Sequence, residues 1–171
     1  MMRSDFRSST KPRYNSCAMS VAASTQSRWT ERPRSPVWRV TSVFPSREAA
    51  KSRLGIPLLF GIDAIHGHAF WPTSTVFPSQ LALSCAWNPE LVAQVGRITA
   101  TEASHTGVHW TFSPVLGVAR DLRWGRIGET FGEDPYLVGV LGSALVRGYQ
   151  GESLSAPDTI AACGKHYVGY S

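Results

Sequence analysis

Short apolar runs alternate with helical repeats of hydrophobic residues from about residue 47 onward. The run over 58–62 (Leu-Leu-Phe-Gly-Ile) follows Pro57 and indicates a buried strand. Similar runs over 108–115 and 159–163 predict a second and a third strand. Between these runs, apolar residues recur at intervals of three and four. The resulting strand–helix–strand–helix–strand order is typical of an α/β fold with a parallel sheet and helical crossovers.

Both expected helices carry start and stop signals. The segment 88–90 (Asn-Pro-Glu) begins the first helix, because Asn caps, Pro suits the first helical position and Glu suits the positive end. This helix is expected to end near Gly107. The segment 134–135 (Asp-Pro) begins the second helix, which is expected to end near Gly148 or Gly151. The apolar positions are Leu91, Val92, Val95, Ile98 and Thr99 in the first helix, and Leu137, Val138, Val140, Leu141, Leu145 and Val146 in the second.

Composition divides the chain of 171 residues into two parts. Residues 1–46 are rich in Ser and Arg and show no sustained apolar period. Residues 1–53 hold 11 Lys and Arg against 3 Asp and Glu, whereas the remainder holds 6 against 9. We therefore expect a disordered or non-homologous basic leader over 1–46 and one globular domain over 47–171. A transit peptide and a misassigned gene start are alternative explanations of the leader.

Several classes of protein are excluded by the same composition. The positive charge lies in the leader and is not paired with ordered aromatic residues, so we expect no nucleic-acid partner. No apolar run approaches the roughly 20 residues that span a bilayer, so we expect no membrane partner. Three widely spaced cysteines fit neither a disulfide scaffold nor a Cys-rich zinc site. No secretory signal is visible, which slightly favours the cytoplasm and otherwise leaves the compartment unknown.

Polar residues follow each predicted strand at the point where the strand ends. Asp63 follows the first strand, Arg126 lies in the polar stretch after the second, and Lys165 and His166 follow the third. The carboxyl ends of parallel strands face one way, so these side chains are expected to converge on one pocket rim. A carboxylate, a guanidinium, an ammonium and an imidazole together suit the hydroxyls of a sugar ring. Taken singly, each residue also has a structural explanation as a cap, a salt-bridged loop residue or a core histidine.

Five segments of the domain resemble the N-terminal domain of glycoside hydrolase family 3, which includes β-glucosidases, β-xylosidases and exo-glucanases. They are Gly-Ile-Asp-Ala-Ile-His-Gly over 61–67, Thr-Val-Phe-Pro over 75–78, Arg-Asp-Leu-Arg-Trp-Gly-Arg over 120–126, Glu-Thr-Phe-Gly-Glu-Asp-Pro over 129–135 and Lys-His-Tyr-Val-Gly over 165–169. The resemblance implies a partial (β/α)8 TIM-like barrel of about three βα units. It also implies that Asp63, Arg126, Lys165 and His166 bind the non-reducing-end sugar of a β-linked glucoside or related oligosaccharide.

The resemblance further implies a retaining, exo-acting β-glucosidase-type mechanism, which needs a carboxylate nucleophile and a separate acid/base group. The family's nucleophile lies in a Ser-Asp-Trp-like motif well downstream of the Lys-His pair. We therefore expect no catalytic residue in this chain, both groups belonging to a missing C-terminal part of the same enzyme. The chain alone is expected to be marginally folded and inactive, with no cofactor and no metal. Glu129 and Asp134 are expected to brace a loop and to begin a helix.

Two alternatives remain open. Asp63, the His66-x-His68 pair and Lys165 also fit the pattern of a metal-dependent amidohydrolase barrel, in which histidines bind zinc and a metal-bound water reacts. That interpretation leaves the Arg-Trp-Gly-Arg and Gly-Glu-Asp-Pro loops without a role. The second alternative is a non-catalytic sugar-binding remnant.

Overall fold

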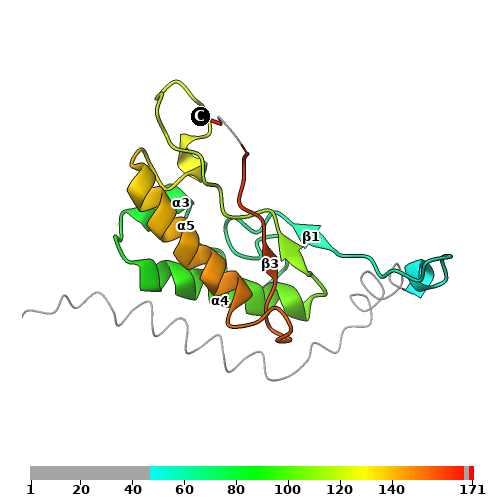
Figure 1. Cartoon of the computed structure of the whole chain (residues 1–171). Helices are drawn as coiled ribbons and strands as arrows, with labels where there is room; N and C mark the ends of the chain where they lie inside the picture. The colour runs from blue at the N-terminus through cyan, green and yellow to red at the C-terminus, as the bar shows by residue number, and fades with distance from the viewer. Residues whose placement is uncertain (1–46, 168–169) are drawn as a thin grey trace, which may run out of the picture. The chain divides into compact units, whose positions relative to one another are not determined.

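The computed structural model describes residues 47–167 and 170–171. The leader predicted over residues 1–46 lies outside this part of the chain. Within it, the order of elements is β1, α3, α4, β2, a short 3-10 helix η1, α5 and β3 (Figure 1). The predicted alternation of strands and helices is confirmed.

The sheet consists of three parallel strands in the order β1-β2-β3. They are β1 (Gly61–Ile62), β2 (Trp110–Thr111) and β3 (Ala161–Ala162). Gly61 pairs with Trp110, which in turn pairs with Ala161. Each strand lies inside the apolar run that predicted it but is much shorter than that run. The α/β class with a parallel sheet is confirmed.

The two long helices begin and end where the sequence signals indicate. In α4 (Pro89–His105), the Asn88 side chain accepts a hydrogen bond from Leu91 N at 3.0 Å. In α5 (Pro135–Gln150), the Asp134 side chain accepts from Tyr136 N at 2.8 Å. Gly151 ends α5 with φ of 55°, a left-handed conformation that favours glycine. No described helix has both the length and the apolar character needed to cross a membrane.

Helix α3 (Gln80–Ser84) was not predicted. The five-residue α3 (Gln80–Ser84) is too short to show a helical period in the sequence. Its N-terminus is capped by Ser79, whose Oγ accepts from Ala82 N at 3.4 Å. Gln80 shows why the helix matters, because its amide is buried and bonds both backbone groups of Val115, at 2.8 Å to the oxygen and 3.0 Å from the nitrogen. The helix thereby secures the chain that leaves β2.

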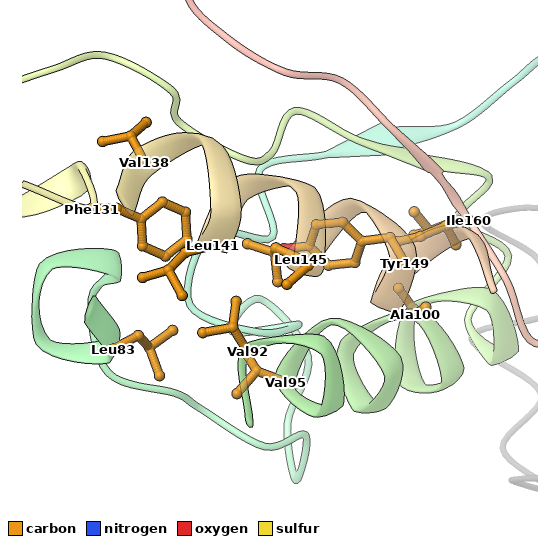
Figure 2. Packing of buried hydrophobic residues seen from close by; sticks show 13 residues of the cluster. Leu83, Val92, Val95, Ala100, Phe131, Val138, Leu141, Leu145, Tyr149 and Ile160 are labelled. Atoms are coloured by element: carbon orange, nitrogen blue, oxygen red, sulfur yellow. The ribbon is translucent and has the colours of Figure 1, made fainter. Parts of the chain in front are cut away.

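The hydrophobic core lies mainly between α4 and α5. Figure 2 shows Leu141 and Leu145 of α5 facing Val92 and Val95 of α4. The two helices approach each other closely at Gly148, where a Cβ atom would lie 2.2 Å from a backbone oxygen of α4. This close packing holds α4 and α5 together as one layer beside the sheet.

Candidate functional site

A buried hydrogen-bond network surrounds the end of β1 and fixes the backbone around Asp63. The Tyr149 hydroxyl lies 3.0 Å from Ser113 Oγ and donates to Ala64 O at 3.2 Å. Ala64 N donates to Thr111 Oγ1 at 3.1 Å. Burial raises the pKa of Tyr149 to about 12, so its hydroxyl remains a donor at any physiological pH. Tyr149 of α5 therefore links Ala64, which follows the end of β1, to Ser113, which follows the end of β2.

Asp63 and Lys165 meet although 102 positions separate them in the sequence. Lys165 Nζ donates a hydrogen bond to Asp63 Oδ1. The lysine backbone is held in place by Pro114 and Leu116: Lys165 N donates to Pro114 O at 2.9 Å, and Leu116 N donates to Lys165 O at 2.6 Å. The Asp63 side chain is 49% exposed and that of Lys165 is 16% exposed. The carboxylate is thus held by a charged partner while remaining open to solvent.

Arg126 is held by Glu129 in a two-bond ion pair. Arg126 Nε lies 2.7 Å from Glu129 Oε1, and Nη2 lies 2.6 Å from Oε2. The pair sits at η1 (Ile127–Glu129) and raises the pKa of Arg126 while holding the pKa of Glu129 below its usual value. Glu129 therefore braces the loop of Arg126, as the sequence predicted.

Tyr170 links the Arg126 loop to His166. The Arg126 guanidinium carbon lies 5.0 Å from the centre of the Tyr170 ring. The His166 ring centre lies 3.9 Å from the same ring, and the Trp124 ring meets it edge-on at 4.9 Å. Four aromatic or cationic groups from two distant segments therefore form one cluster.

The pKa of His166 is influenced by the three other predicted site residues. Partial burial lowers the pKa of His166, and the positive charges of Arg126 and Lys165 lower it further. The carboxylates of Glu129 and Asp63 act in the opposite direction. The net effect favours the neutral imidazole, which can both donate and accept a hydrogen bond. Asp63, Arg126 and Lys165 thus all lie within electrostatic range of His166, near the carboxyl ends of the strands.

The His66-x-His68 pattern does not assemble a metal site. His68 is buried, and its Nε2 lies 2.9 Å from Thr106 Oγ1. His66 Nδ1 lies 3.4 Å from the backbone oxygen of Phe77. In the described ranges 47–167 and 170–171, no group of three or more His, Cys, Asp or Glu residues could hold a metal ion. The amidohydrolase interpretation is therefore not supported.

Two features of the site were missed in the sequence. Tyr170 was not singled out, although an aromatic residue four positions after His166 was an available signal. The buried Glu102 of α4 accepts from Thr75 N at 2.9 Å and from Thr75 Oγ1 at 2.8 Å, so it fixes the loop that follows β1. A glutamate on a helix is usually solvated, and nothing in its spacing indicates this inward direction.

Known proteins of similar sequence are longer glycosidases. A lysosomal β-glucosidase of Dictyostelium discoideum is 38% identical over 122 residues, which cover 68% of this chain and 15% of that protein. A periplasmic β-glucosidase of Salmonella typhimurium is 41% identical over 121 residues, covering 71% of this chain and 15% of that protein. The chain thus spans about 15% of the length of these curated relatives.

Solved structures agree with the sequence relatives. A β-glucosidase involved in saponin metabolism from intestinal bacteria matches with a TM-score of 0.70 and 45% identity, over 87% of this chain and 24% of that one. A β-glucosidase from Listeria innocua, solved in complex with glucose, matches with a TM-score of 0.66 and 45% identity, over 72% of this chain and 17% of that one. Residues 40–171 also match the sequence profile of the glycosyl hydrolase family 3 N terminal domain. The chain therefore belongs to glycosyl hydrolase family 3 and carries sequence of its N-terminal domain.

Proposed function

We propose that Asp63, Arg126, Lys165 and His166 bind the hydroxyls of the non-reducing-end sugar of a β-linked glucoside. In this proposal they form the sugar-binding part of a retaining, exo-acting β-glucosidase-type active site. The observation that carries the proposal is the contact between Asp63 and Lys165, which pairs two charges at the carboxyl ends of β1 and β3 and leaves the carboxylate half exposed. The binding of glucose by the related Listeria innocua enzyme supports it.

The chemistry of the pair suits adjacent hydroxyl groups. A carboxylate offers two acceptor oxygens, and the contact with Lys165 involves only Oδ1 of Asp63. An ammonium has three donors, so Lys165 can donate to a sugar oxygen while it holds Asp63. A hydroxyl that donates to Asp63 and accepts from Lys165 would have both of its roles satisfied. Charge-assisted hydrogen bonds of this kind are stronger than those between neutral groups.

Glu129 is not suited to act as the catalytic acid. A general acid needs a raised pKa, as a carboxyl in an apolar pocket has. The Arg126 guanidinium instead holds the pKa of Glu129 below its usual value. We infer that the nucleophile and the acid/base of such an enzyme come from outside residues 47–171. The 171-residue chain then binds sugar without cleaving it.

Calorimetric titration of the full chain with glucose tests the binding. Asp63→Ala and Lys165→Ala should each raise the dissociation constant about tenfold or more, because each removes a charge-assisted hydrogen bond. Asp158→Ala is a matched control, since Asp158 is a similarly exposed aspartate paired with Arg97 just before β3. It should leave the affinity unchanged. Equal affinity of Asp63→Ala, Lys165→Ala and the wild type would end the proposal, and turnover of an aryl β-glucoside by the chain would contradict its inactivity.

A further inference from the structure

We propose that Tyr170 is a positioning residue that holds Arg126 and His166 in the orientation that the sugar site requires. The inference deepens the proposed function and rests on it. Tyr170 contacts both residues. In Figure 1 the last residues of the chain run beside the loop that follows β2.

The Tyr170 ring joins two loops that come from different strands. Arg126 lies after β2, whereas His166 and Tyr170 follow β3. The ring is 5.0 Å from the guanidinium carbon and 3.9 Å from the imidazole centre, with an angle of 42° between the two rings. A cation over an aromatic face is attracted by the negative face of the ring. One side chain therefore restrains both the cation and the imidazole of the site.

Gly117 provides independent evidence for this placement. A Cβ atom at Gly117 would lie 2.9 Å from Tyr170 O and 3.3 Å from side-chain carbons of Tyr170 and Trp124. Only a residue without a side chain allows the end of the chain to lie this close to the loop. Trp124 then closes the cluster by meeting the Tyr170 ring edge-on at 4.9 Å, a favoured geometry for aromatic pairs.

Tyr170 and Glu129 restrain Arg126 in complementary ways. The carboxylate holds the guanidinium through Nε and Nη2, and the guanidinium carbon lies over the Tyr170 ring. The remaining N–H donors can then point in few directions. Pre-organised donors of this kind bind a ligand more tightly, because less freedom is lost on binding.

The expected behaviour of three variants separates positioning from simple packing. Tyr170→Phe keeps the ring and should bind glucose within about twofold of the wild type. Tyr170→Leu introduces a smaller apolar side chain that covers less of the imidazole and has no aromatic face, and it should weaken glucose binding about threefold to tenfold. Tyr167→Leu is the matched control, because Tyr167 belongs to the same segment and is 98% exposed. It should change nothing.

Proton NMR of the His166 imidazole gives a readout that does not depend on sugar. In the wild type, cross-relaxation between the ring protons of His166 and Tyr170 is expected from the 3.9 Å separation of their centres. In Tyr170→Leu the imidazole signals should shift and its pKa should rise toward the ordinary value of 6.5, because part of its burial is lost. In Tyr170→Phe and Tyr167→Leu both should remain as in the wild type.

Each outcome decides the inference. Absence of the cross-relaxation, or unchanged imidazole signals and glucose affinity in Tyr170→Leu, overturns it. Equal losses in Tyr170→Phe and Tyr170→Leu would also overturn it, because the ring would then not be the active part. If Tyr170→Leu does not fold, the wild-type cross-relaxation and Tyr170→Phe still test the contact. If Asp63→Ala leaves glucose affinity unchanged, the proposed sugar site is wrong. If Asp63→Ala weakens glucose binding and Tyr170→Leu does not, only the positioning role of Tyr170 is wrong.

Discussion

Gly148→Ala should strongly destabilise the fold, because it places a methyl group where α5 touches the backbone of α4. The added Cβ would lie 2.2 Å from Ala93 O, 2.9 Å from Gly96 Cα and 3.0 Å from Arg97 N. All three are backbone atoms, so no side chain can rotate away to make room. The helices themselves would have to separate.

The magnitude follows from two opposing effects. A separation of about 1 Å would forfeit a quarter to a half of the dispersion energy between the facing side chains. Overpacking of this kind costs about 1–3 kcal/mol, and the backbone character of the contact places Gly148 toward the upper end. The higher helix propensity of alanine offsets about 1 kcal/mol. The free energy of unfolding should therefore fall by about 2 kcal/mol.

Urea unfolding of the full chain, followed by circular dichroism, measures this change. Gly139→Ala is the matched control, because Gly139 lies in the same helix and a Cβ atom there meets nothing within 4 Å. It should raise the free energy of unfolding by about 0.5–1 kcal/mol, through helix propensity alone. The two alanine variants are thus expected to have opposite signs.

A Gly148→Ala variant as stable as the wild type would refute the reasoning. It would mean that α4 and α5 do not approach as closely as the distances at Gly148 require. A destabilised Gly139→Ala variant would instead show that the exposed face of α5 is covered.

Two further predictions concern buried polar groups. Tyr149→Phe should lower the free energy of unfolding by about 1–3 kcal/mol in urea titrations, because Ser113 Oγ and Ala64 O lose a buried partner; an unchanged midpoint would contradict the network. Burial raises the pKa of Glu102 above its ordinary value of 4.5, despite the hydrogen bonds from Thr75. The folded chain therefore binds this proton more tightly than the unfolded chain, and wild-type stability should fall relative to Glu102→Gln as the pH rises from about 4 to about 7. A difference independent of pH, in urea titrations at both ends of this range, would show that Glu102 is not buried.

The ends of both long helices were predictable because their signals are local. Asn88 and Asp134 cap the helices that directly follow them, and Gly151 ends α5 in a left-handed conformation. Such contacts join residues two to four positions apart and depend little on the rest of the chain. Of the predicted apolar faces, Val92, Val95, Val138, Leu141 and Leu145 lie in the core. Other predicted positions are only partly buried, among them Leu91, Ile98, Val140 and Val146.

The meeting of Asp63 and Lys165 was also predictable, although they are far apart in sequence. Each follows a predicted parallel strand, and the geometry of a parallel sheet places such residues at one edge. The inference needed only the strand order and direction. It did not need the lengths of the strands, which the apolar runs overestimated.

Amino-acid order alone therefore predicted the two long helices, the parallel direction of the sheet and the meeting of Asp63 with Lys165 at its carboxyl edge. Tertiary structure decided the roles of Tyr170, Glu102 and Gln80, as well as the presence of α3. These depend on which distant backbone or ring lies opposite each side chain, and no periodicity or local motif carries that information. The sequence does not show whether a given tyrosine, glutamate or glutamine faces water or holds two loops together. Only the surrounding packing decides which hydrogen bonds and ring contacts each side chain makes.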